Sequence, residues 1–340
     1  SNDANSELVF GLASSDSVEF LRILWPGGVR QTELATNGNQ EINIKELDRK
    51  GTSCPILYAW DGSDFRFVTD ILGGAIIGYQ TGAGTFNYPD SDEYVSLGAI
   101  EPLDGNYTLK ITNQLEEVIY IDALELIAVD HPKNVSVYPN ERLLSSPPYP
   151  EFKLYSLADF RSPSTAVDDN GNSLIDAIKK IDDKWYDRFE VTDIHGYADP
   201  HYIELEWEDL GSIENPVLVG YGWVDYAHST SNWSASQRGL SLSPNKLEVG
   251  DGKGGWELVT ADMGNPAGLP KSMVYDLNNV FSQKDYRLRI TTNAAVYWDQ
   301  IVICENIEIT LPQNRQRPSK ADLVWRGYPK HSPINQTFAY

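Results

Sequence analysis

The stretch "TTNAAVYWDQIVI" (residues 291–303) places one acidic residue inside a run of β-branched and aromatic residues. Apolar and polar residues alternate there with a period of two, which predicts one strand followed, after a short turn, by a second strand. On the second strand, side chains two residues apart share a face, so Asp299 is expected on the same face as Tyr297, Ile301 and Ile303.

A carboxylate on an apolar face must find hydrogen-bond donors or a cation. We therefore predict a structural role for Asp299, with hydrogen bonds from a loop backbone or from Arg287 or Arg289 on the preceding strand. Binding of a ligand or of calcium is an alternative role, and general acid catalysis is a third.

The same alternation recurs along the whole chain, and Gly, Pro and Asn turns separate the short strands. This pattern predicts a mainly β protein. A small N-terminal β-unit and a β-domain are expected to precede an antiparallel β-sandwich of jelly-roll or galactose-binding-like character, with one short helix. The helix is predicted at about residues 173–186, because four apolar residues fall on one helical face there: Leu174, Ile175, Ile178 and Ile181.

Turn-rich and Pro-rich passages set the predicted domain boundaries. We predict a truncated β-unit at 1–50, a β-domain at 51–138, a linker at 139–165, the β-sandwich at 166–312 and a C-terminal arm at 313–340.

The chain of 340 residues is acidic, with a formal net charge of -22. Such a charge repels a phosphate backbone, so nucleic acid is excluded as a partner. A stretch of about 18 apolar residues is absent, so no membrane span is predicted. The sequence opens without a Met or a signal peptide, so we expect it to be part of a longer protein.

The two cysteines, Cys54 and Cys304, are predicted to be structural, either as one disulfide or as two buried thiols. Four Asn-x-Ser/Thr sequons are candidates for glycosylation if the protein is secreted through an endoplasmic reticulum. They are Asn106, Asn134, Asn232 and Asn335.

Catalytic motifs are weak: the sequence contains no Gly-x-Ser-x-Gly nucleophile turn. Paired carboxylates such as Glu204 and Glu206 are typical of a solvated acidic face. They also leave open the alternative of an enzyme that acts on polysaccharides, with two carboxyl groups facing each other across a cleft. No residue is assigned as catalytic.

The stretch "DDNGNSLID" (168–176) places oxygen-bearing side chains at alternate positions, as calcium loops do. The candidate ligands are Asp168, Asn170, Asn172 and Asp176, which makes Ca²⁺ the candidate cofactor. Lys179 occupies the position where an EF-hand has a bidentate Glu. The alternative is a turn rich in Asn and Asp that caps the helix.

Aromatic residues are frequent, with nine Trp and nineteen Tyr. Core packing is expected to use most of them, and exposed rings are suited to binding sugars. The loop "YAHSTSNWSASQRG" (226–239) mixes aromatic and polar groups as ligand sites do. Its candidate ligand-binding residues are Tyr226, His228, Asn232, Trp233, Gln237 and Arg238.

The stretch from Val18 to Glu46 resembles the end of an ASPIC/UnbV domain, which has a strand, a Trp-Pro-x-Gly turn and a final alternating strand. The matching residues are Trp25, Pro26, Gly28, Gln31, Asn39, Gln40, Ile42, Ile44 and Glu46. The first part of the domain is missing from the resemblance.

Later segments resemble those that follow this domain in a group of bacterial proteins. They are "CPILYAWDG" (54–62), "FVTDILGG" (67–74), "DEY" (92–94), "DMGNPAGLPK" (262–271) and "TNAAVYWD" (292–299).

The resemblance implies a chain that is secreted, at the cell surface or periplasmic, and that follows an FG-GAP/VCBS β-propeller in a longer protein. It implies no catalytic residue. We expect a non-enzymatic extracellular module whose β-sandwich contacts a glycan, a partner protein or a neighbouring subunit. Two alternatives remain: a self-assembling structural subunit of an extracellular filament, and a polysaccharide-acting enzyme.

Overall fold

A computed structural model of the protein describes residues 8–24, 30–44, 54–113, 118–307 and 309–325. The chain divides into two compact units, Ser1–Lys50 with Ser319–Tyr340, and Gly51–Pro318. Strands make up 41% of the structure and helices 5%, so the prediction of a mainly β protein is confirmed.

The first unit contains one antiparallel hairpin. Strand β1 (Ser17–Leu24) pairs with β2 (Arg30–Asn37), from Ser17 opposite Asn37 to Leu24 opposite Arg30. This pairing agrees with the small β-unit predicted at the N-terminus, although the turn at 25–29 lies outside the described residues. The strand expected around Ile42 and Ile44 is absent from the described residues 41–44.

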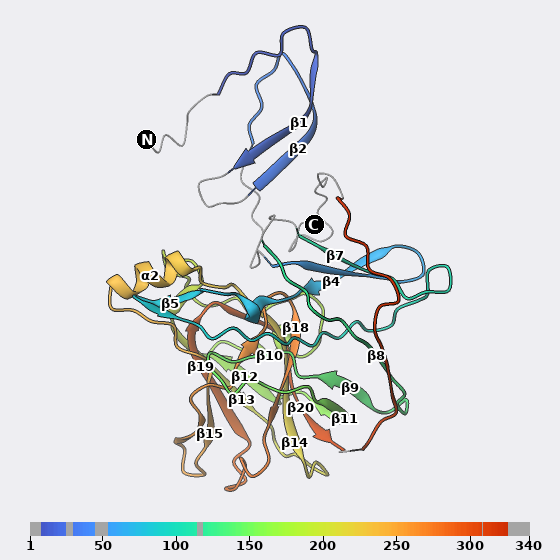
Figure 1. Ribbon diagram of the computed structural model, residues 1–340. Coiled ribbons are helices and arrows are strands. Elements are labelled where there is room, and N and C mark those ends of the chain that lie inside the picture. Colours follow the sequence, from blue (N-terminus) through green and yellow to red (C-terminus); the bar gives the residue numbers. More distant parts are fainter. Residues whose placement is uncertain (1–7, 25–29, 45–53, 114–117, 308, 326–340) are drawn as a thin grey trace. The chain divides into compact units, whose positions relative to one another are not determined.

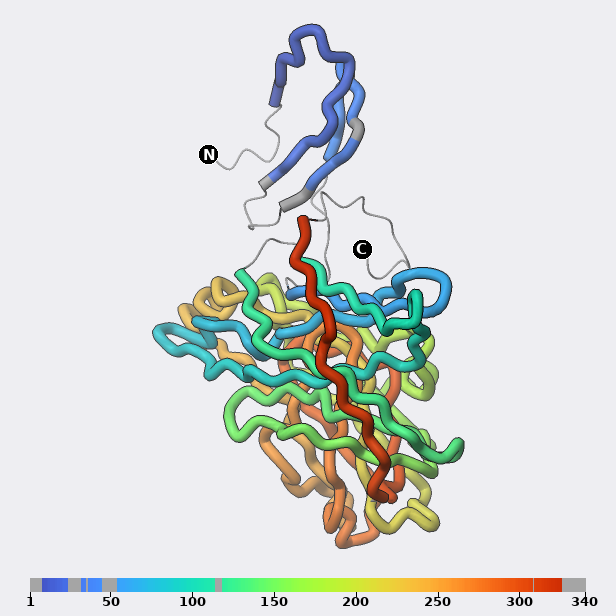
Figure 2. The backbone as a smooth tube through the Cα atoms, turned by 45° about the vertical axis from the view of Figure 1, so that its right-hand side comes forward, coloured from blue at the N-terminus to red at the C-terminus, as the bar shows by residue number. Residues whose placement is uncertain are grey.

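The second unit begins with small sheets and hairpins (Figure 1). Strands β3 (Ile56–Trp60), β4 (Phe65–Asp70) and β7 (Leu109–Thr112) form a sheet in the order β4-β3-β7. A 3₁₀ turn, η1 (Gly73–Ala75), leads to the hairpin of β5 (Gln80–Gly82) and β6 (Thr85–Phe86). Two further pairs are β8 (Leu126–Val129) with β21 (Gln313–Gln316) and β10 (Arg142–Leu143) with β17 (Asn265–Pro266). The stretch that contains β21 crosses the outside of this unit (Figure 2).

Two five-stranded antiparallel sheets form the body of the second unit. The first has the order β18-β14-β20-β11-β9, with β18 (Lys271–Asp276), β14 (Pro216–Val224), β20 (Val296–Asn306), β11 (Leu154–Arg161) and β9 (Ser136–Pro139). The second has the order β12-β13-β19-β15-β16, with β12 (Thr165–Asp168), β13 (Tyr197–Glu206), β19 (Arg287–Ala294), β15 (Lys246–Gly250) and β16 (Trp256–Thr260).

The first sheet has a hydrophobic core on each face. On β14, Leu218 belongs to a large core that also contains Ile203 and Leu288 of the second sheet, whereas its neighbours Val217 and Val219 belong to a separate cluster. Both faces are therefore apolar, which explains why strands such as "PVLVGYGWV" read as nearly continuous hydrophobic runs. The two sheets share the large core, and their jelly-roll or galactose-binding-like type stays a prediction.

The segment predicted as a linker, residues 139–165, contains strand β11. This strand pairs with β20 on one side and with β9 on the other, so it lies inside the first sheet. The Pro-rich passage "SPPYP" (146–150), which suggested a domain boundary, is a short connection between two strands of the same unit.

The predicted helix at 173–186 is wrong beyond its first turn. Only α1 (Ile175–Ile178) is helical. The following residues run beside β20, where the backbone N–H of Tyr186 donates to the carbonyl of Trp298 at 2.7 Å. Tertiary pairing with β20 therefore outweighs the helical periodicity. No helix among the described residues is long and apolar enough to cross a membrane.

Asp299 lies at a β-bulge of β20. Tyr221 pairs with Gln300 while Gly222 pairs with Trp298, so Asp299 is an extra residue without a partner in the ladder. The bulge changes which side chains of β20 share a face. Trp298 packs with Ile301 in the large core, so the predicted alternation of faces fails at this point.

The Asp299 carboxylate is fully buried and accepts hydrogen bonds from the backbone N–H groups of Asp182 (3.1 Å) and Asp183 (3.1 Å). Burial raises its pKa, and the two backbone donors act in the opposite direction. The loop backbone thus supplies the donors, whereas Arg287 and Arg289 pair with other carboxylates.

An Asp299→Ala substitution should destabilise the protein, because it leaves two partly buried backbone N–H groups without their acceptor. The expected loss is about 1–3 kcal/mol in the free energy of unfolding, measured by urea denaturation. Glu257→Ala, at an exposed position of β16, is the matched control and should stay within about 0.5 kcal/mol. Equal stability of the two variants would contradict the structural role.

Candidate functional site

The loop predicted to bind ligand is mostly a helix, α2 (Ser229–Gln237). Its Ser-rich sequence has a low intrinsic helix propensity, which is why the sequence indicated a loop. Packing compensates for this, since Ala235 is fully buried and Asn232 is only 2% exposed.

Asn232 joins α2 to the β5–β6 hairpin. Its side-chain amide donates to the hydroxyl of Tyr79 (2.9 Å) and to the carbonyl of Gln80 (2.8 Å), and its oxygen accepts from the hydroxyl of Tyr197 (2.8 Å). The hydroxyl of Ser229 adds a bond by accepting from the backbone N–H of Gln80 (3.0 Å). Asn232 is therefore an internal connector and not a contact for ligand.

The sequons differ in exposure. A glycan is attached to the side-chain amide of Asn, and in Asn232 that group is buried and makes two hydrogen bonds. Asn106 and Asn134 are exposed. Asn335 lies outside the described residues.

Aromatic rings reach solvent on both sides of this connection. Phe86 is 60% exposed and Tyr88 71% exposed at the hairpin, and Trp233 of α2 is 48% exposed. The predicted residues His228, Gln237 and Arg238 are exposed at or beside the same helix. We call the set Phe86, Tyr88, His228, Trp233, Gln237 and Arg238 the α2–hairpin surface. Helix α2 and β5 lie side by side in Figure 1.

Two polar members of the surface have partners. The guanidinium of Arg238 donates twice to the carboxylate of Asp193, at 2.8 and 2.9 Å. The imidazole of His228 stacks on that of His195, with ring centroids 4.5 Å apart. Burial, followed by the neighbouring His195, lowers the pKa of His228.

Tyr226 does not belong to the α2–hairpin surface. Its hydroxyl is buried and faces Gly73, where an added Cβ atom would lie 3.2 Å from the oxygen. Burial raises the pKa of this hydroxyl well above its usual value. The prediction that Tyr226 contacts a ligand at the surface is thus corrected by its inward orientation.

The four predicted calcium ligands do not form an oxygen cage. One carboxylate oxygen of Asp168 accepts from the backbone N–H groups of Asn170 (3.1 Å) and Asn172 (2.8 Å), while Asp176 pairs with Lys179 at 2.5 Å. Among the described residues, no group of three or more His, Cys, Asp or Glu side chains is arranged to hold a metal ion. The geometry is that of an Asx turn, as in the alternative, but this turn does not cap α1: the N-cap residue is Leu174, and no side-chain hydrogen bond caps the helix.

Cys54 and Cys304 are both buried, and no disulfide joins them. Cys304 lies on β20 in the second hydrophobic cluster, and burial raises the pKa of its thiol. This describes a core residue of low reactivity.

Three of the segments singled out by resemblance meet in the interior. Asp70 ends "FVTD", Glu93 belongs to "DEY" and Lys271 ends "PAGLPK". The ammonium of Lys271 lies 2.5 Å from Oδ1 of Asp70 and 3.6 Å from Oε1 of Glu93. We call these three residues, together with Glu141, the Lys271 cluster.

The carboxylates of the cluster are held by backbone groups. Glu141 accepts from the N–H of Ser96 (2.7 Å) and from the N–H of Ser272 (2.8 Å), and Glu93 accepts from the N–H of Leu72. Burial raises the pKa of Glu93 to about 7 and also raises the pKa of Glu141. Three carboxyl groups thus share one amine in an environment that disfavours charge.

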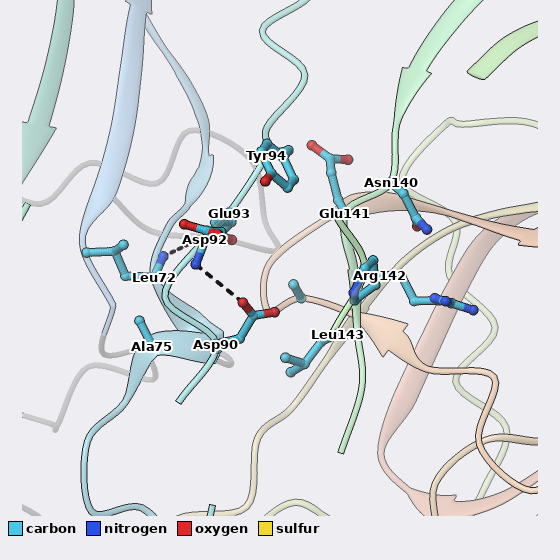
Figure 3. Close-up of a pocket in the computed structure, with 13 residues that line it drawn as sticks. Leu72, Ala75, Asp90, Asp92, Glu93, Tyr94, Asn140, Glu141, Arg142 and Leu143 are labelled. Carbon is cyan, nitrogen blue, oxygen red and sulfur yellow. Dashed lines mark hydrogen bonds between the residues drawn. The ribbon is translucent and has the colours of Figure 1, made fainter. Parts of the chain in front are cut away.

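A small pocket lies beside the cluster (Figure 3). Its walls include Asp90, Glu93, Tyr94, Glu141 and Arg142. The cavity volume is about 20 Å³, which is room for about one water molecule. The pocket is therefore large enough for a water molecule and too small for a sugar ring.

The Lys271 cluster was not predicted as a site, although three of its four residues lie in segments noted for their resemblance. A signal was present, since an Asp, a Glu and a Lys each stand inside one of the similar segments. The sequence contains no indication that Asp70 and Lys271, which are 201 positions apart, lie in contact.

The raised pKa of Glu93 predicts a pH-dependent stability. In the unfolded chain the carboxyl group ionises near 4.5, and in the folded protein near 7. The folded state therefore holds the proton more tightly, and stability should fall as pH rises from about 4.5 through 7.

The expected loss between pH 5 and pH 8 is about 1–3 kcal/mol in the free energy of unfolding, measured by urea denaturation at both pH values. Glu93→Gln should reduce this difference because it removes the titrating group. The same pH dependence in the parent and in Glu93→Gln would contradict the assignment.

Comparison with known proteins supports the resemblance at the N-terminus. Residues 3–51 match the model of the family described as ASPIC and UnbV. No curated protein and no solved structure gives a match to the chain. The region of residues 3–51, which contains the β1–β2 hairpin, is therefore similar to the ASPIC and UnbV family.

Proposed function

We propose that the chain is a non-enzymatic binding module that recognises a glycan through the α2–hairpin surface. It works as part of a longer protein that is secreted, at the cell surface or periplasmic. The family match of residues 3–51 supports this setting, and an upstream β-propeller is part of the proposal.

The observation that carries the proposal is the exposure of three aromatic rings on two elements that pack together: Phe86 and Tyr88 at the hairpin and Trp233 on α2. Exposed apolar groups that gather at one place mark interaction sites more often than scattered ones do. Rings offer flat faces to the C–H side of a sugar, while Gln237, Arg238 and His228 offer hydrogen-bond donors.

The surface is also held in shape before any ligand arrives. The hydrogen bonds of Asn232 fix α2 against the β5–β6 hairpin. A preorganised surface loses less conformational entropy on binding than a mobile loop.

The surroundings of two buried carboxyl groups with raised pKa, Glu93 and Glu141, support binding over catalysis. Glu93 and Glu141 accept backbone hydrogen bonds around a buried lysine. A glycosidase instead needs two carboxyl groups facing each other across a substrate cleft.

A glycan array probed with the full chain tests the proposal. We expect retention of at least one glycan class, with Trp233→Ala weakening binding to it by about tenfold or more, as loss of an exposed aromatic anchor does. Leu258→Ala is the matched control, since Leu258 is 57% exposed on β16, in the second sheet. This control should bind as the parent does.

Absence of retention on every glycan would contradict the proposal. Sedimentation that shows large assemblies of the parent would then favour the structural-subunit alternative.

A further inference from the structure

The contact between Lys271 and Asp70 differs from the other ion pairs described in this protein. The two side chains are 1% and 0% exposed, and Nζ lies 2.5 Å from Oδ1. For comparison, Lys246 and Glu248 lie 3.1 Å apart with 39% and 12% of their side chains exposed. Burial lowers the pKa of Lys271, but the neighbouring carboxylates of Asp70 and Glu93 outweigh it and raise the pKa above its usual value. The pair therefore rests as ammonium and carboxylate, in contact and away from bulk water.

We propose that Lys271 and Asp70 form an intramolecular isopeptide bond, and that Glu93 transfers the proton during its formation. This covalent modification joins β4 to β18 across 201 residues of sequence. It does not depend on the proposed glycan binding.

The reaction is a condensation that needs no other reagent. A proton moves from the ammonium of Lys271 to the carboxylate of Asp70, which gives an amine and a carboxylic acid. The Nζ–Cγ bond then forms, the Cγ–Oδ2 bond breaks, and one molecule of water leaves. Nothing is oxidised or reduced, and the product is a neutral amide.

The two oxygens of Asp70 have different surroundings. Oδ1 accepts a hydrogen bond from the backbone N–H of Leu269 at 3.0 Å, a donor that also stabilises negative charge on this oxygen during attack. Oδ2 is buried and has no hydrogen-bond partner. The structure therefore marks Oδ1 as the oxygen that stays and Oδ2 as the one that leaves.

Glu93 is placed to carry the proton. Its Oε1 lies 3.6 Å from the amine, and this atom is buried without a hydrogen-bond partner. A group with a pKa near 7 exchanges protons readily at neutral pH. It gives a proton to Oδ2 and takes one from the amine, so it ends the reaction unchanged.

Burial of several charges provides a driving force. Three carboxyl groups surround one ammonium in the Lys271 cluster, and each ion is costly to keep away from water. Condensation removes one positive and one negative charge and leaves an uncharged amide. The released water has room in the adjacent pocket of about 20 Å³.

Gly268 allows the approach. Its φ is +102°, and a Cβ atom at this position would lie 2.5 Å from Oδ2 of Asp70. A side chain there would push the carboxylate away from the strand that holds Lys271.

Intact mass of the denatured, purified full chain is the direct test. We expect a mass lower than the sequence mass by one molecule of water. Trypsin should then release one branched peptide, residues 67–110 joined to residues 254–284, uncut after Lys271. A parent protein with the full sequence mass, or with a cut after Lys271, overturns the proposal.

Variants separate the roles. Lys271→Arg keeps the positive charge but has no condensing amine, so its mass should equal its sequence mass. In Glu93→Gln, most molecules should still have the full sequence mass at a time when the parent has lost one water. Lys246→Arg, which alters the exposed pair, is the matched control and should still lose one water. Loss of water in Lys271→Arg would place the reaction elsewhere and overturn the assignment.

Discussion

A lysine and an aspartate that meet in the interior connect the small β3–β4–β7 sheet to the large body. Lys271 begins β18, an edge strand of the first sheet, and Asp70 ends β4. Removal of either partner leaves an uncompensated buried charge, which is among the costliest changes a core can undergo. The neighbouring Glu141 extends the connection by bonding Ser96 to Ser272, so several segments of chain depend on the same place.

The first sheet explains why these segments form one body. On the face away from the large core, the sheet also carries apolar residues that must be buried. Val217, Val274 and Val302 pack there with Leu157 in a second cluster. A sheet that is apolar on both faces does not end a domain at its surface. Residues 51–138 belong to the same unit as the two five-stranded sheets, whereas the sequence suggested a separate β-domain there.

Local signals predicted local structure well. The pair Asp61-Gly62 is typical of a tight turn, and the β3–β4 hairpin turns there, with one carboxylate oxygen of Asp61 accepting from the backbone N–H groups of Ser63 and Asp64. Period-two alternation likewise located β19 and β20. These features depend on residues that are neighbours in sequence, so a single sequence contains the information.

Features that depend on distant contacts were missed. Helix α2 is stabilised by Asn232 and the hairpin, and the helix at 173–186 is cut short by pairing with β20. In the loop predicted to bind ligand, Trp233 and Arg238 are exposed, whereas the hydroxyl of Tyr226 is buried, which the sequence did not indicate. The bulge at Asp299 required knowledge of the register between β14 and β20, which no local pattern contains.

The long separation between Asp70 and Lys271 also sets an order of events during synthesis. Lys271 follows Asp70 by 201 positions, a length of chain that takes roughly 10–40 s to translate at about 5–20 residues per second. A contact with so large a separation also closes only after the intervening strands have shortened the loop. The β3–β4 hairpin therefore leaves the ribosome long before its partner strand, and its buried aspartate spends that interval in water.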